Sequence, residues 1–167
     1  MYQLSTDQYF AFVLEEVLAL SNNDGAATGE ALRIASQIQP GDFESFYSAF
    51  YYMAEQINSI AESVNVTRDP ISARGAYFRA ASYYRAADFF LHGNLSDPRI
   101  YSLWNQALDS FEHAIALLDI PAQRVTLKAH CSIGDFEVQA IFYKAAPCDT
   151  QRPTVVRSNP SHSPMTS

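Results

Sequence analysis

The hydrophobic period of the sequence changes after Pro121, and this change limits the folds that the chain can adopt. Upstream of that proline, apolar residues recur at steps of three and four, the pattern of one face of an amphipathic helix. Downstream, the segments 124–130 and 136–145 alternate apolar and polar residues, as half-buried strands do. The chain is therefore expected to be mainly α, with a small β part near its carboxyl-terminal end.

Capping and turn residues divide the first 120 residues into about five helices. The expected helices begin near Asp7, Thr28, Asp42, Ser72 and Pro98. Asp42 is expected to act as an N-cap, because its carboxylate can accept hydrogen bonds from the amides of the next turn. Asp97 followed by Pro98 predicts a helix start of the same kind. The fifth helix carries an apolar stripe that is expected to face the core and to include Leu103, Trp104 and Leu108.

The alternating segments 124–130 and 136–145 predict a β-hairpin, with a tight connection at residues 133–135. A short apolar run at 153–156 is expected to begin a third strand. The sequence of 157–167 is rich in serine and proline and has no apolar period, which predicts a disordered tail. We therefore divide the chain into a helical region at 1–120, a strand region at 121–156 and a tail at 157–167.

Composition narrows the function classes. The chain has 11 basic and 18 acidic residues and a formal net charge of −7, which argues against a nucleic-acid partner. No apolar run approaches the about 20 residues that a membrane-spanning helix needs, so no membrane partner is expected. The amino terminus lacks a basic leader, and the chain has only two cysteines. Together these observations predict a cytoplasmic location.

Motifs of catalysis and cofactor binding are missing from the sequence. It contains no G-x-S-x-G nucleophile elbow, no phosphate-binding loop and no dinucleotide fingerprint. The four histidines are scattered, and none is paired with a second ligand at a metal-binding spacing. We therefore expect no catalytic residue, no cofactor and no metal site in these 167 residues.

The tyrosine-rich helices carry the candidate ligand-binding residues. On the fourth helix, Tyr77 and Tyr84 lie near one line, and Arg85 is spaced to pair with Asp88. Tyr47 and Tyr51 of the third helix are candidates to face a pocket, because a buried phenol needs a hydrogen-bond partner and a ligand can supply it. Two interpretations are open: a polar and aromatic wall over a ligand, or ordinary helix packing with one exposed ion pair. The candidate substrate-binding residues are Tyr47, Tyr51, Tyr77, Tyr84, Arg85 and Asp88.

The segment 68–144 resembles a known family. Its most specific stretches are AYFRAASYYRAADFFLHG at 76–93 and DPRIY at 97–101, followed by the predicted hairpin. They resemble the fungal α/β-hydrolases that shorten polyketides, of which the heptaketide hydrolases of pigment pathways are typical, and the related bacterial dihydropseudooxynicotine hydrolases. The resemblance implies that residues 1–120 form a helical cap and that the strands begin an incomplete α/β-hydrolase sheet.

The resemblance ends after Val156, before the position where the family carries its nucleophile elbow. It therefore implies a truncated form of a hydrolase of fungal secondary metabolism, with no catalytic residue to carry over and no expected activity alone. In the full-length family the implied partner is a small polyketide-like or aromatic substrate. The oligomeric state is left open, and the acidic composition allows a homodimer.

A second class of protein also fits part of the pattern. The fifth helix contains W-x-x-A-L-x-x-F-x-x-A, which is similar to the helices of tetratricopeptide repeats. Such repeats stack in pairs and form grooves that bind peptides. The glycine and the closing proline of the repeat are not in place, and the hairpin has no role in a helical solenoid.

Overall fold

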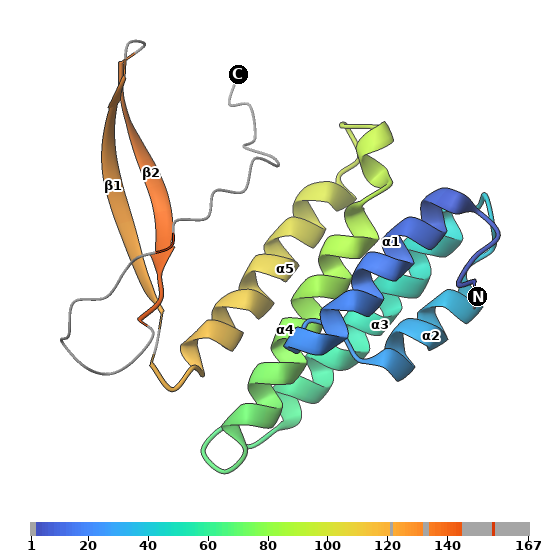
Figure 1. Ribbon diagram of the computed structural model, residues 1–167, viewed down its shortest axis with the longest axis horizontal. Helices are drawn as coiled ribbons and strands as arrows, with labels where there is room; N and C mark the ends of the chain where they lie inside the picture. The colour runs from blue at the N-terminus through green and yellow to red at the C-terminus, as the bar shows by residue number, and fades with distance from the viewer. Residues whose placement is uncertain (1–2, 121, 132–133, 145–154, 156–167) are drawn as a thin grey trace.

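The computed structural model describes residues 3–120, 122–131, 134–144 and 155. Its helices are α1 (Gln8–Ala19), α2 (Thr28–Gln37), α3 (Phe43–Ser63), α4 (Pro70–Asp88) and α5 (Arg99–Ala116), with 3-10 turns η1 (Leu20–Asn23) and η2 (Leu91–Gly93). Strands β1 (Gln123–Cys131) and β2 (Gly134–Phe142) form one antiparallel sheet. The predicted class, mainly α with a small β part, is confirmed (Figure 1).

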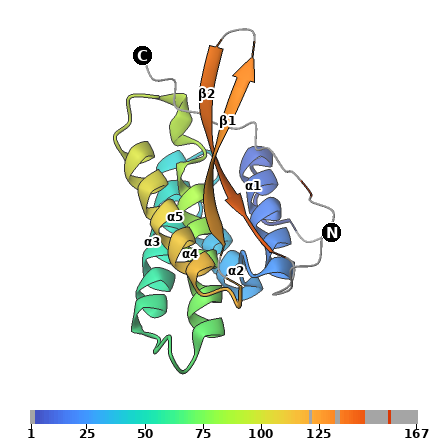
Figure 2. The same cartoon turned by 90° about the vertical axis from the view of Figure 1, so that its left-hand side faces the viewer.

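The helices form a bundle around α4. This helix packs extensively against α3 and against α5. Helix α2 packs against α3, and α1 contacts α2 and α4. Strands β1 and β2 extend beyond the bundle as a two-stranded arm, which both views show (Figures 1 and 2). In the residues that the structure describes, no helix is long and apolar enough to cross a membrane.

The helix starts follow from their capping residues. The carboxylate of Asp42 accepts from the amides of Glu44 at 3.0 Å and Ser45 at 3.1 Å, so the predicted cap of α3 is confirmed. Helix α4 begins at Pro70 rather than near Ser72, because proline suits the first turn of a helix, where its missing N–H costs nothing. Helix α5 begins at Arg99, one residue later than predicted.

The buried face of α5 differs from the predicted stripe. Leu103 is buried, but Trp104 is 41% exposed and Leu108 is 38% exposed. Small side chains, Ser110 and Ala114, are buried instead. Small side chains at a helix contact allow the two helices to approach closely.

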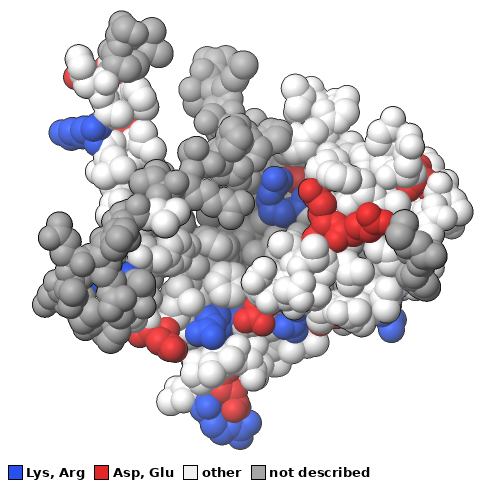
Figure 3. Space-filling view, in the orientation of Figure 1, with Lys and Arg blue, Asp and Glu red and all other residues white. Residues whose placement is uncertain are grey.

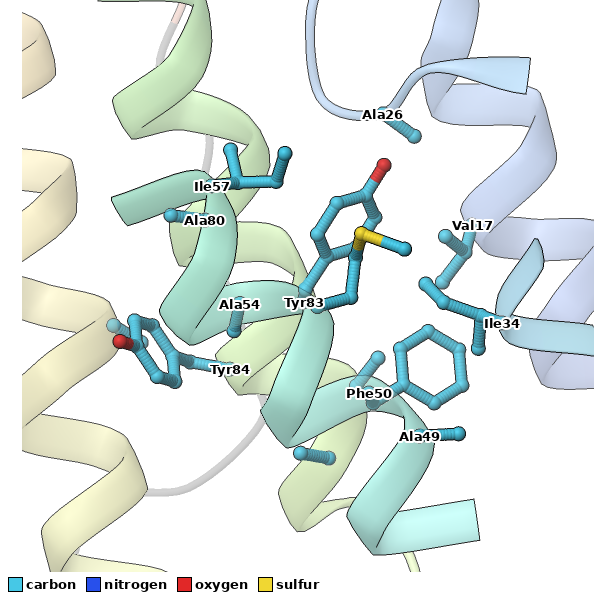
Figure 4. Packing of buried hydrophobic residues seen from close by; sticks show 14 of the residues in the cluster. Val17, Ala26, Ile34, Ala49, Phe50, Ala54, Ile57, Ala80, Tyr83 and Tyr84 are labelled. Atoms are coloured by element: carbon cyan, nitrogen blue, oxygen red, sulfur yellow. The ribbon is translucent and has the colours of Figure 1, made fainter. Parts of the chain in front are cut away.

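Two consecutive tyrosines of α4 point to opposite sides of the helix (Figure 4). Tyr83 lies in the core, where its hydroxyl donates to Glu30 Oε2 at 2.7 Å and accepts from the amide of Ala27 at 3.0 Å. Arg79 Nε donates to the same carboxylate oxygen at 3.0 Å. Burial, the largest cause, raises the pKa of the Tyr83 phenol. These hydrogen bonds join the start of α2 to α4.

We expect Tyr83→Phe to lower the free energy of unfolding by about 1–2 kcal/mol, because the change removes the hydroxyl that Glu30 and the half-buried Ala27 amide share as a hydrogen-bond partner. Urea unfolding followed by circular dichroism measures this difference. The matched control is Tyr52→Phe, since Tyr52 is 51% exposed and should tolerate the change. Equal losses in the two variants would show that the network does not stabilise the fold.

The hairpin is confirmed, and its register separates an apolar face from a polar one. Leu127 pairs with Val138 on one face, whereas Lys128 pairs with Glu137 on the other. Gly134 has φ +131° at the start of β2, a conformation that other residues rarely adopt. The apolar face stays largely open, with Leu127 53% exposed and Phe136 49% exposed. The predicted third strand at 153–156 and the tail at 157–167 fall, apart from Val155, outside the described residues.

Candidate ligand-binding seam

A row of polar and aromatic side chains follows one face of α3, beside its core-facing residues. Tyr47, Tyr51 and Glu55 are spaced four residues apart, which places them on one side of the helix. Tyr84 of α4 and Gln106 of α5 meet this row from the neighbouring helices. We call the group formed by Tyr47, Tyr51, Glu55, Tyr84 and Gln106 the α3–α5 seam.

The aromatic part of the seam is a stack of half-buried rings. Tyr47 and Tyr51 lie with ring centroids 5.5 Å apart and an interplanar angle of 10°. The Arg99 guanidinium lies 4.5 Å from the centroid of the Tyr47 ring, and Arg99 also binds Glu44 at 2.7 Å. Cation–π and stacking contacts of this kind fix the orientation of the rings. The seam therefore presents flat, ordered aromatic surface.

The polar part of the seam is centred on the Glu55 carboxylate. The Tyr84 hydroxyl donates to Glu55 Oε1 at 2.6 Å, and Gln106 Nε2 donates to the same oxygen at 3.1 Å. Tyr84 is 2% exposed, and burial, followed by its bond to Glu55, raises the pKa of its phenol. The phenol therefore stays protonated and acts as a donor to Glu55. Figure 4 shows its ring directed away from Tyr83, toward α5.

A second polar group lies at the carboxyl-terminal end of α4. Asp88 is 1% exposed and accepts from Arg85 Nη1 at 3.0 and 3.1 Å, while His92 Nε2 lies 3.7 Å from Asp88 Oδ2. The Arg85 guanidinium also lies 5.7 Å from the centroid of the Trp104 ring. Burial raises the pKa of Asp88, and its contacts with Arg85 and His92 only partly offset this. The negative end of the α4 dipole also disfavours a carboxylate here.

The structure brings some of the predicted site residues together and leaves one apart. Tyr47, Tyr51 and Tyr84 meet in the seam, and Arg85 pairs with Asp88 as predicted. Tyr77 lies two turns before Tyr84 and stacks on His113, with centroids 5.0 Å apart. The role of the six predicted residues in binding a substrate stays a prediction.

Glu55 and Gln106 belong to the seam but are not among the site residues that the sequence predicted. A signal for Glu55 was present, because Tyr47, Tyr51, Glu55, Asn58 and Glu62 follow one another at steps of three and four along α3. Gln106 had no comparable signal, since its contact with Glu55 joins residues 51 positions apart.

Two open cavities lie elsewhere on the molecule. One, of about 380 Å³, lies where the helices meet the hairpin and is lined by residues that include Arg74, Phe78 and Tyr143. The other, of about 360 Å³, lies at the hairpin and is lined by residues that include Lys128 and Phe136. None of the predicted substrate-binding residues lines either cavity. Within the described ranges, no group of three His, Cys, Asp or Glu residues is placed to hold a metal ion.

On the face that Figure 3 shows, Lys and Arg side chains are interspersed with Asp and Glu and do not form one continuous basic patch. Binding to a phosphate backbone depends on such clustered positive charge.

Comparison with known proteins supplies the class of this chain. No family profile matches it. Over most of its length, however, it is homologous to fungal hydrolases, several of which are named alpha/beta hydrolases. The recognised resemblance to fungal hydrolases is therefore confirmed, and no finding supports the tetratricopeptide alternative.

Three relatives illustrate the match. Hydrolase acrC of Aspergillus aculeatus is 35% identical over 119 residues, which cover 71% of this chain and 28% of acrC. The 20-hydroxy-prefusarin hydrolase FUS2 of Gibberella moniliformis is 35% identical over 119 residues, with the same shares of 71% and 28%. Alpha/beta hydrolase gkaG of Penicillium citrinum is 30% identical over 118 residues, covering 71% of this chain and 27% of gkaG. The matched segment thus spans little more than a quarter of these curated relatives.

The raised pKa of Asp88 predicts a pH-dependent stability. Between pH 3.8 and the raised pKa, the folded chain holds a proton at Asp88 that the unfolded chain has released. This contribution to the free energy of unfolding is full below pH 3.8 and is lost as the pH rises through the raised value. We expect Asp88→Asn to remove that dependence.

The measurement is the difference in the free energy of unfolding between wild type and Asp88→Asn from pH 4 to pH 7. It should shift in favour of the variant as the pH rises. Asp109→Asn, at an exposed residue of α5, is the control and should show no such trend. A flat difference for Asp88→Asn would contradict the assigned direction.

Proposed function

We propose that this chain is the helical cap and the first-strand segment of an α/β-hydrolase of fungal secondary metabolism. In this assignment residues 1–120 form the cap and residues 121–156 begin the sheet. The homology to fungal hydrolases over 71% of the chain supports it. We further propose a cytoplasmic location and leave a homodimer open, in line with the acidic composition.

The seam suggests the substrate class. Stacked tyrosine rings next to a hydrogen-bonding carboxylate suit a small planar molecule, aromatic or polyketide-like, which buries its ring faces and places a polar group at Glu55. One relative, FUS2, is named as the hydrolase of 20-hydroxy-prefusarin. The observation that carries this proposal is the convergence of three helices on the seam, with the Tyr47–Tyr51 stack at its edge.

In this proposal the chain binds and orients substrate but does not attack it. Hydrolysis of an ester or a C–C bond in this fold needs an activated serine, a histidine and amide donors aimed at the developing oxyanion. We assign none of these roles to a residue of this chain. The reacting serine would belong to the part of the hydrolase that lies outside the matched segment.

The assignment predicts that the purified chain hydrolyses p-nitrophenyl acetate no faster than a matched concentration of denatured chain, because binding surface alone cannot replace the nucleophile. Release of p-nitrophenolate measures the rate. Turnover above this background that a serine-directed phosphonate abolishes would overturn the division of roles.

Ring stacking in the seam predicts that Tyr51→Ala weakens the binding of 2-methoxynaphthalene about 2–12-fold, the effect of losing about 0.5–1.5 kcal/mol of aromatic contact. Fluorescence titration of the full chain measures the dissociation constant. Tyr52→Ala is the matched control, because Tyr52 follows Tyr51 on α3 and is exposed on another face. Equal effects of the two changes would remove the seam as the binding surface.

A further inference from the structure

We propose that Glu55 is the specificity-determining residue of the seam and that it selects ligands carrying a free hydroxyl group on a planar aromatic ring. The hydroxyl would donate its hydrogen bond to Glu55 Oε2. This inference rests on the proposed function, since it takes the seam to be the ligand-binding surface.

The two carboxylate oxygens of Glu55 differ in their hydrogen bonds. Tyr84 and Gln106 both donate to Oε1 of Glu55, at 2.6 and 3.1 Å. In the part of the chain that the structure describes, no hydrogen bond reaches Oε2. A carboxylate accepts hydrogen bonds through both oxygens, so Oε2 can accept one from a ligand.

Donors from two other helices hold the Glu55 carboxylate in place. Tyr84 belongs to α4 and Gln106 to α5, whereas Glu55 belongs to α3. Two donors that grip one oxygen fix the plane of the carboxylate before any ligand arrives. An acceptor ordered in this way loses little conformational entropy on binding, which favours affinity and selectivity.

The polar groups of the seam differ in whether a ligand can reach them. Tyr84 is 2% exposed and its hydroxyl is already committed to Glu55, so a ligand has no route to a bond with it. Glu55 is half-buried and therefore reachable. Arg99 is committed too, because it binds Glu44 and Asp97 at 2.7 Å each. Glu55 thus offers the open polar atom beside the tyrosine stack.

The spacing of Tyr51 and Glu55 on α3 suits a ligand that contacts both side chains. Tyr51 precedes Glu55 by one helical turn, so the two side chains are neighbours, with about 5–6 Å between their Cβ atoms. A fused aromatic ring that stacks on Tyr51 can place a ring hydroxyl at Glu55. A ligand with an ether oxygen at that position could not donate, and two oxygen acceptors would then face each other.

The test compares 2-naphthol with 2-methoxynaphthalene, which differ in the hydroxyl hydrogen, by fluorescence titration of the full chain. Wild type should bind 2-naphthol at least about 10-fold more tightly, the effect of a hydrogen bond to a charged group. Glu55→Gln should lose this preference, because its single amide oxygen is taken by Tyr84 and its NH₂ group faces the ligand as a donor. Glu55→Gln should bind 2-methoxynaphthalene more tightly than wild type does, because its NH₂ group can donate to the ether oxygen that the carboxylate opposes.

Glu16→Gln, at an exposed residue of α1, is the matched control and should keep the preference for 2-naphthol. If wild type binds both probes equally while Tyr51→Ala weakens both, the role of Glu55 is wrong and the seam stands. If Tyr51→Ala weakens neither probe, or if neither binds below about 1 mM, the seam itself is wrong and the inference falls with it. The comparison of the two probes on wild type decides the matter even if Glu55→Gln does not fold.

Discussion

Burial of two adjacent tyrosines on α4 obliges each hydroxyl to find a hydrogen-bond partner inside the protein. Tyr83 finds Glu30 and the Ala27 amide on the side of α2, and Tyr84 finds Glu55 on the side of α3 and α5. Helix α4 is thus hydrogen-bonded to α2 through Tyr83 and to α3 through Tyr84. The first contact stabilises the fold, and the second orders the carboxylate of the proposed ligand site.

Two surfaces of the chain differ in what they offer a partner. The α3–α5 seam combines ordered aromatic rings with a carboxylate, which suits a small molecule with both ring and polar atoms. The apolar face of the hairpin, which includes Leu127 and Phe136, has no comparable polar group and is open in the described structure. It suits continuation of a sheet and its covering helices, as the α/β-hydrolase assignment requires.

Local signals in the sequence predicted the elements well, because capping and period act over a few residues. Asp42 capped α3 as expected, and the alternation after Pro121 became the hairpin. The contacts of the seam depend on how helices pack, which period alone does not encode. Ser110 of α5 is buried while Trp104 is 41% exposed, and Gln106 donates to Glu55 of α3. The role of the site residues therefore stays a prediction.

The α3–α5 seam is the proposed ligand-binding surface of this chain. Intermolecular NMR contacts between bound 2-naphthol and the assigned side chains of the full chain locate the ligand on the protein. We expect contacts from the naphthol ring to the rings of Tyr47 and Tyr51. Contacts confined to the apolar face of the hairpin, at Leu127 and Phe136, would contradict it.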